Sequence, residues 1–380
     1  MRFPIKTTFL VALLTTCGAA YLLSRNTLEQ MVGQMIMTGF HGDGEKTLPD
    51  DFAAVSEQVR RGQIGGVILF DVETSGNIKN LKQVRKMIKR LSSLAPNKLL
   101  IAIDQEGGHV QRLKSEHGFV STPGARVLSQ GMPADTYSVA YDMGMRLADL
   151  GINVNFAPVL DVDVDPKSPA IGAHGRSFSD NPDTVYIYAN AFASGLSDAG
   201  VSYSFKHFPG HGSAGTDSHL GLTDVTKTYQ EYELDPWRKV VSDMPNGGTV
   251  MVAHIVNRNI DDVPASLSQK HIQILRDMGF DGVIFSDDMD MGAISKEYGL
   301  ENAVKMAINA GNDILIFGNN LLFDKNRGRD INAMIVDMVR RGEISESRIR
   351  ESYGRIMRLK RNIGHRKAKR KNYDNQGTGI

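Results

Sequence analysis

The sequence VSYSFKHFPGHG, residues 201–212, joins an alternating apolar run to a glycine-rich turn that carries two histidines. Residues 201–205 favour a strand, because valine and aromatic side chains alternate there with serines. Gly210 and Gly212 allow the backbone to turn sharply and to approach a ligand closely. A strand followed at once by a polar, glycine-rich turn is typical of an active-site loop.

Seven further apolar runs occur along the chain, separated by amphipathic stretches. One such stretch lies between Asn181-Pro182 and Gly200, and its apolar residues recur at helical spacing: Val185, Ala189, Phe192 and Leu196. Unbroken apolar strands alternating with helices indicate parallel strands buried on both faces. The sequence predicts a single (β/α)8 TIM-type barrel, with an open doubly wound sheet as the alternative. The expected strands are residues 35–40, 66–70, 99–104, 152–159, 201–207, 249–254, 282–287 and 313–317.

The charge of the chain is unevenly distributed. Its 380 residues carry a net charge of +1, so no general attraction to nucleic acid is expected. Residues 358–371 hold eight Lys or Arg and no acidic residue, which leaves −7 for the remainder. We expect residues 364–380 to be a basic, disordered tail that is solvated, with contact to an anionic lipid or polymer as the alternative.

The amino-terminal segment resembles a targeting sequence. Arg2 and Lys6 precede an apolar run at residues 9–14, which continues weakly to Leu23. We expect residues 1–25 to be a signal peptide or membrane anchor, so that residues 26–363 form an exported catalytic domain that is periplasmic, membrane-anchored or a lipoprotein. Cys17 is the single cysteine, and the catalytic domain therefore has no intrachain disulfide.

Two residues downstream of the glycine-rich turn are candidates for proton transfer. Asp217 and His219 are close enough in sequence to hydrogen-bond, and a carboxylate partner raises the basicity of an imidazole. His219 is therefore a candidate general acid/base. Two alternatives remain open, a solvated surface loop and a zinc site formed by His207, His211, His219 and Asp217, although no HExxH or CxxC spacing accompanies them.

Acidic residues also follow other predicted strands. Asp161, Asp163 and Asp165 alternate after the fourth run, and we interpret them as solvated carboxylates, with a calcium site as the alternative. Asp287 and Asp288 end the seventh run, where strand alternation means that one of them faces the site. That aspartate could act as a covalent nucleophile or a charge stabiliser, and a helix cap is the structural alternative.

Five motifs occur in one order along the chain: IDQEGGHVQR at 103–112, GRSF at 175–178, KHFPGHG at 206–212, DSH at 217–219 and FSDD at 285–288. Together they resemble the bacterial β-N-acetylglucosaminidases of glycoside hydrolase family 3. The resemblance implies a TIM-type barrel that removes terminal β-linked N-acetylglucosamine from peptidoglycan fragments or chitooligosaccharides. It implies no metal and no organic cofactor.

The resemblance also assigns residues. It makes Asp287 the nucleophile, His219 the acid/base and Asp217 the partner of that histidine. It implies sugar-binding roles for Asp104, Arg112, Arg176, Lys206 and His207. The chain departs from the family at His109, where arginine is usual, and in its amino-terminal segment, because relatives with these motifs are often cytoplasmic.

The implied mechanism is a double displacement with retention of configuration. Three alternatives remain open. Phosphate could replace water, which would give a phosphorylase, or the sugar could differ, as in β-glucosidases of the same family. The non-enzyme alternative is a membrane-tethered glycan-binding protein, although such a protein would be expected to lose Asp287 or His219.

Overall fold

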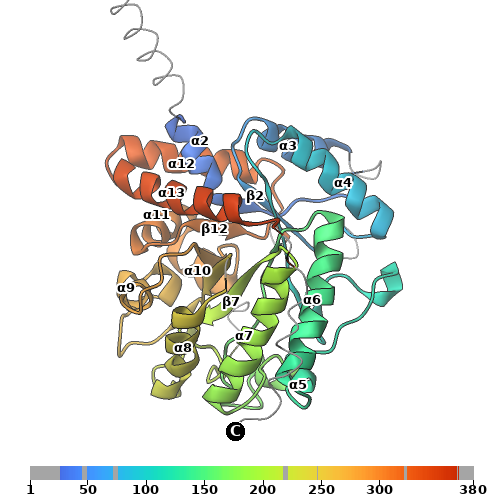
Figure 1. Ribbon diagram of the computed structural model, residues 1–380. Coiled ribbons are helices and arrows are strands. Elements are labelled where there is room, and N and C mark those ends of the chain that lie inside the picture. The colour runs from blue at the N-terminus through green and yellow to red at the C-terminus, as the bar shows by residue number, and fades with distance from the viewer. Residues whose placement is uncertain are drawn as a thin grey trace, which may run out of the picture.

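Eight parallel strands close into a barrel in the computed structural model, which describes residues 26–44, 49–71, 76–216, 221–245, 247–320, 323–365 and 367 (Figure 1). The barrel prediction is confirmed, and the open sheet is wrong because the first strand pairs with both the second and the last. Each of the eight predicted runs overlaps one barrel strand. Around the barrel these are β1 (Ile36–Thr38), β12 (Ile314–Phe317), β11 (Ile284–Asp288), β9 (Gly248–Val252), β7 (Ser202–Phe208), β6 (Val154–Asn155), β3 (Leu100–Ile103) and β2 (Gly66–Leu69). Strands β7, β9 and β11 extend one residue beyond their runs.

Helices follow the strands and cover the outside of the barrel (Figure 1). α2 (Leu28–Gln34) precedes β1 and packs against the last two helices of the fold. The remaining helices, in chain order, are α3 (Pro49–Arg60), α4 (Leu81–Leu94), α5 (Ala125–Leu128), α6 (Pro133–Leu150), α7 (Pro182–Asp198), α8 (Asp235–Asp243), α9 (Gln269–Asp277), α10 (Gly292–Tyr298), α11 (Leu300–Ala310), α12 (Arg327–Arg340) and α13 (Glu346–Asn362).

Helix α7 has the ends that its sequence predicts. The side chain of Asn181 accepts hydrogen bonds from the backbone amides of Asp183 and Thr184 at 2.9 and 3.1 Å, and Gly200 has a φ of 82° beyond the last turn. Helix α7 packs closely on α6, because a Cβ at Gly195 would lie 2.5 Å from the carbonyl oxygen of Tyr137. This contact fixes the helix that leads into β7, the strand that carries the KHFPGHG motif.

Short elements beyond the strand ends build the loops of one barrel face. β4 (Gln105–Gly107) and β5 (Val110–Gln111) form a hairpin directly after β3. β8 (Thr223–Asp224) pairs with β10 (Ile255–Val256), which joins the loops that follow β7 and β9. The 3-10 turn η2 (Gly172–His174) lies in the long connection between β6 and α7. These loops lie at the carboxyl ends of the strands, where barrel enzymes place their active sites.

The other end of the barrel is held by a buried carboxylate. Asp313, which precedes β12, is fully buried and forms ion pairs with Arg276 and Arg348 at 3.1 and 2.9 Å. It also accepts hydrogen bonds from the Ser352 hydroxyl at 2.7 Å and from the Ile284 amide at 3.1 Å. Asp313 therefore connects β11, β12, α9 and α13.

The carboxyl-terminal residues remain attached to the barrel past the expected domain boundary. The amide of Gly364 donates to the carbonyl of Gly200 at 2.9 Å, and the amide of Lys367 donates to the carbonyl of Asp198 at 2.7 Å. Residues 366 and 368–380, which make up most of the expected tail, lie outside the described residues, as does the targeting segment 1–25. Within the described ranges no helix is long and apolar enough to cross a membrane.

Replacing Asp313 by alanine should lower the free energy of unfolding by roughly 3–5 kcal/mol, because it leaves partly buried arginines without their buried carboxylate. Asp281→Ala is the matched control. Asp281 is exposed and pairs with Arg355 and Arg358 at 3.0 and 2.8 Å, so its loss should cost less than about 1 kcal/mol. Urea denaturation measures both variants, and equal losses would contradict the structural role of Asp313.

Candidate active site

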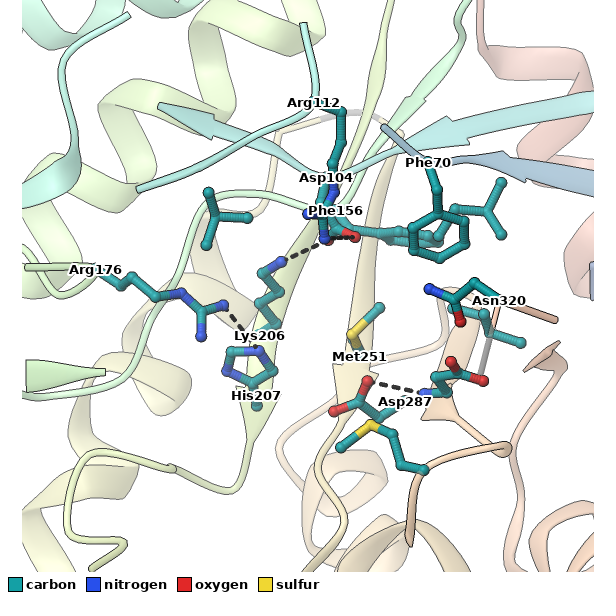
Figure 2. A pocket seen from close by; sticks show the side chains of 15 residues that line it. Phe70, Asp104, Arg112, Phe156, Arg176, Lys206, His207, Met251, Asp287 and Asn320 are labelled. Atoms are coloured by element: carbon teal, nitrogen blue, oxygen red, sulfur yellow. Dashed lines mark hydrogen bonds and ion pairs between the residues drawn. The ribbon is translucent and has the colours of Figure 1, made fainter. Parts of the chain in front are cut away.

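A cavity of about 300 Å3 opens at the carboxyl ends of the barrel strands. It brings together six of the eight residues predicted from the sequence (Figure 2), namely Asp104, Arg112, Arg176, Lys206, His207 and Asp287. Asp217 and His219 lie outside the described residues, so their predicted roles stay predictions. The six residues come from four different strand ends and their loops, which only the closed barrel brings to one place.

A buried ion network forms one side of the cavity. Glu106 binds Arg176 through two hydrogen bonds, from Nε at 2.9 Å and from Nη2 at 2.7 Å. Lys206 Nζ lies 2.7 Å from the same Glu106 oxygen that accepts Arg176 Nη2, and it donates to Asp104 at 2.9 Å. Arg112 extends the network to Asp104, with 3.6 Å between Nη2 and Oδ2. Lys206 and Arg176 are therefore held in place without a ligand.

The network keeps its members ionised. Burial alone would raise the pKa of Glu106, but the charges of Arg176 and Lys206 hold it well below its usual range. For Lys206 the same two effects act in the opposite directions. Burial lowers its pKa, and the charges of Asp104 and Glu106 raise it above the ordinary value. The pKa of Asp104 is lowered because Lys206 and Arg112 outweigh the effect of its burial. The cavity therefore keeps fixed positive and negative charges at neutral pH.

A second buried carboxylate supports His207. Asp161 is fully buried, and its Oδ2 lies 2.6 Å from His207 Nδ1. Asp163 is also buried and pairs with Arg126. The interpretation of these aspartates as solvated carboxylates is therefore wrong for Asp161 and Asp163, whose partners lie in other segments and cannot be found from local spacing.

Close approach of the glycine-rich turn brings Asp161 to His207. A Cβ on Gly212 would lie 1.6 Å from the carbonyl oxygen of Val162, so only glycine fits against this backbone. The register of β7 against β9 shifts between Phe205 and Phe208. Such an irregularity redirects side chains, and the consecutive residues Lys206 and His207 both line the cavity.

Asp287 and Asp288 both line the cavity, so the expectation that only one of them would face the site is wrong. A register shift between Phe285 and Asp288 breaks the alternation on which that expectation depends. Oδ1 of Asp288 accepts hydrogen bonds from the amides of Gly318 and Asp290 at 2.7 and 3.0 Å. Asp288 thus connects the end of β11 to Gly318, the residue after β12. The side chain of Asp287 accepts a hydrogen bond from the backbone amide of Asp288 at 2.8 Å.

Apolar side chains complete the cavity wall. Figure 2 shows Phe70, Phe156 and Met251 around the charged groups, and each of them lines the cavity. Arg112 lies over the ring of Phe70, with 5.7 Å between its guanidinium carbon and the ring centroid. Apolar faces combined with a few fixed polar groups are typical of small-molecule sites.

His109, the departure from the usual family sequence, lies in the hairpin loop between β4 and β5. Its ring stacks on that of His174 with 3.8 Å between centroids. The pair connects this loop to η2. Its member in η2, His174, lies two residues before Arg176 in the sequence. The pKa of His109 is lowered, first by partial burial and then by the neighbouring His174 and Arg176.

The zinc alternative concerns residues that are only partly described. Of its members, His207 has Nδ1 bonded to Asp161, and burial lowers the pKa of His211 to about 4. Across the described ranges, the one group of three metal-type ligands within 4.8 Å of one another is Asp71, Glu116 and His117. Lys114 Nζ lies 2.7 Å from Asp71, so a cation already pairs with one carboxylate of this group.

The model of the glycosyl hydrolase family 3 N-terminal domain matches residues 27–359. The chain belongs to glycoside hydrolase family 3. The predicted resemblance to this family is thus confirmed.

Similar proteins of family 3 are named β-hexosaminidases or β-N-acetylglucosaminidases. The chain is 34% identical to β-hexosaminidase A of Pseudoalteromonas piscicida over 88% of its own length and 61% of that protein. It is 37% identical to a β-hexosaminidase of Shewanella frigidimarina over 70% of its length and 78% of that protein. The solved family 3 β-N-acetylglucosaminidase from Paenibacillus sp. superposes with a TM-score of 0.80 and 33% identity, covering 94% of this chain and 64% of that one. The chain thus spans less than two thirds of the first and last of these.

Asp288→Asn should stabilise the protein at alkaline pH. Burial, with the nearby Asp290 charge, raises the pKa of Asp288 to about 7. The protonated form is therefore favoured on folding, and its contribution is present below the unfolded pKa of about 4 and lost as pH rises towards 7. Asparagine keeps the acceptor oxygen and removes the titration.

Urea denaturation at two pH values tests this prediction. At pH 8 the variant should unfold with a free energy roughly 1–3 kcal/mol higher than the wild type, and at pH 4 the two should be similar. Asp277→Asn, at the exposed end of α9, is the matched surface control and should change the free energy of unfolding by less than about 0.5 kcal/mol. A variant that is less stable than the wild type at pH 8 would show that ionised Asp288 stabilises the fold.

Proposed function

We propose that this protein is a retaining β-N-acetylhexosaminidase that removes single terminal N-acetylglucosamine residues. The natural substrates would be peptidoglycan fragments or chitooligosaccharides. The observation that carries this proposal is the cavity itself, in which Asp287 at the end of β11 lies among five polar residues expected to bind the sugar. Family membership and the names of the relatives support the same sugar.

The size of the cavity supports exo cleavage. A volume of about 300 Å3 lies at the small end of the range for ligand sites and suits one sugar ring. Lys206, Arg176 and Arg112 would donate hydrogen bonds to the hydroxyl oxygens of that ring. Because Glu106 and Asp104 already hold these cations, binding would cost little additional ordering and would align the anomeric carbon with Asp287.

The proposed chemistry has two steps. Asp287 attacks the anomeric carbon while His219 donates a proton to the leaving oxygen, and a glycosyl-aspartate forms. His219 then takes a proton from water, which releases the sugar with its original configuration. Asp217 would stabilise the imidazolium of His219 in the first step. The roles of Asp217 and His219 rest on the family motif, because both lie outside the described residues.

We also propose that residues 1–25 direct export, with either cleavage or retention as a membrane tether. The sequence pattern of a positive start followed by an apolar run supports this proposal. Fractionation of cells that express the full chain tests it. Recovery in the periplasmic or membrane fraction is expected, and recovery in the cytosol would contradict it.

Hydrolysis of paired aryl glycosides tests the proposed activity. The protein should release the phenol from aryl β-N-acetylglucosaminide, and the rate on the matching β-glucoside should be at least 100-fold lower, a discrimination of about 3 kcal/mol. Adding phosphate should change neither the rate nor the product. Free N-acetylglucosamine should be the only sugar released.

The other outcomes identify the alternatives. Phosphate-dependent release of a sugar phosphate would indicate a phosphorylase, and preference for the glucoside would indicate a β-glucosidase. Asp287→Asn is the control for adventitious activity, since it should abolish release from both substrates without changing the melting temperature. Binding of sugar without turnover by the wild type would favour a glycan-binding protein.

A further inference from the structure

Asp161 lies behind the cavity and does not line it. The residue is fully buried, and three donors converge on its carboxylate. Oδ1 accepts the backbone amides of His207 and His211 at 3.1 and 2.8 Å, while Oδ2 faces the ring nitrogen Nδ1 of His207 at 2.6 Å. The carboxylate thus holds both the backbone and the ring of His207.

This environment favours the ionised form of Asp161. Burial opposes ionisation, but the hydrogen bonds that the carboxylate accepts from the ring and the backbone amide of His207 hold the pKa of Asp161 below the ordinary value. An ionised carboxylate accepts hydrogen bonds and cannot donate them. A distance of 2.6 Å therefore requires a proton on Nδ1 of His207.

The opposite edge of the same ring faces a cation. Nε2 of His207 lies 3.5 Å from Nη2 of Arg176, and a dashed line in Figure 2 marks this contact. A guanidinium has five N–H donors and no acceptor, so it is compatible with a lone pair on Nε2 and repels an N–H there. The two edges of the ring therefore favour one tautomer, with the proton on Nδ1 and a lone pair on Nε2.

We propose that Asp161 is a positioning residue that fixes His207 in the Nδ1–H tautomer, so that Nε2 accepts a hydrogen bond from a substrate hydroxyl. The hydroxyl oxygen would in turn accept an N–H from Arg176. Lys206, Arg112 and Arg176 can only donate, whereas a sugar hydroxyl also needs an acceptor for its own proton. The tautomer depends on the structure alone, while the identity of the hydroxyl as part of a sugar rests on the proposed function.

Nitrogen NMR of the full chain tests the tautomer without any assay of activity. Protonated and unprotonated imidazole nitrogens differ widely in 15N chemical shift, and His207→Gln identifies the signals of His207 among the ten histidines. In the wild type Nδ1 should be protonated and Nε2 unprotonated. In Asp161→Asn the amide can donate to Nδ1, so Nε2 should gain the proton. A wild-type His207 protonated at Nε2, as the other tautomer or as an imidazolium, would overturn the proposal.

Kinetic measurements distinguish a role of Asp161 in positioning the His207 ring from a purely structural role. Asp161→Asn keeps an oxygen for the backbone amides of His207 and His211, and it should lower kcat/KM on the aryl N-acetylglucosaminide by about 10- to 100-fold. In the His207→Gln background, where no ring remains to be oriented, the same change should have almost no further effect. Equal, additive losses in both backgrounds would show that Asp161 acts only on the fold.

Asp163→Asn is the matched control. Asp163 is a buried aspartate two residues away, and its partner is Arg126 rather than His207. This variant should keep the wild-type NMR signals of His207 and the wild-type kcat/KM. If the protein hydrolyses neither aryl substrate, the NMR experiment still decides whether Asp161 sets the tautomer, so failure of the proposed function and failure of this proposal are distinguishable.

Discussion

The site depends on one buried carboxylate oxygen that is shared by two cations. Oε1 of Glu106 lies 2.7 Å from both Lys206 Nζ and Arg176 Nη2. Without this charge the ammonium and the guanidinium would repel each other in a buried setting, where water screens them little. Glu106 therefore holds the ends of β3 and β7 and the loop after η2 together. Asp104 and Arg112 extend the ion network from Lys206.

The amino ends of the barrel strands carry a stabilising ion-pair cluster, and the carboxyl ends carry the cavity. Asp313 connects strands and helices at the amino ends of the strands, and no cavity-lining residue is among its hydrogen-bonding or ion-pair partners. At the carboxyl ends, burial and neighbouring charges shift the pKa values of the titratable groups in different directions. Glu106 and Asp161 are held ionised, while the pKa of Asp288 is raised to about 7 and that of His211 is lowered to about 4. A neutral sugar would thus meet Glu106, Asp104 and Lys206 with charges that stay fixed near neutral pH, whereas Asp288 in the cavity wall titrates there.

The sequence predicted the barrel because parallel strands buried on both faces have long apolar runs, and all eight runs overlap a barrel strand. It also placed Asp287, Lys206 and Arg176 at strand ends and in the loops that follow them, where parallel pairing brings residues together. The supporting residues were missed. Glu106 is 70 residues from Arg176, and Asp161 is 46 residues from His207, so no local spacing shows that they pair. The alternation of Asp161, Asp163 and Asp165 suggested solvated carboxylates because local pattern cannot show burial by a distant loop.

The proposed activity depends most directly on attack by Asp287 at the anomeric carbon. Mass spectrometry of the protein after brief reaction with a 5-fluoro N-acetylglucosaminyl fluoride tests it directly, because fluoride needs no proton to leave and the ring fluorine slows release of the intermediate. The result predicted is one added sugar on the peptide that contains Asp287, and no adduct in Asp287→Asn. A sugar attached to another residue, or continued turnover of ordinary substrate by Asp287→Asn, would contradict the assignment.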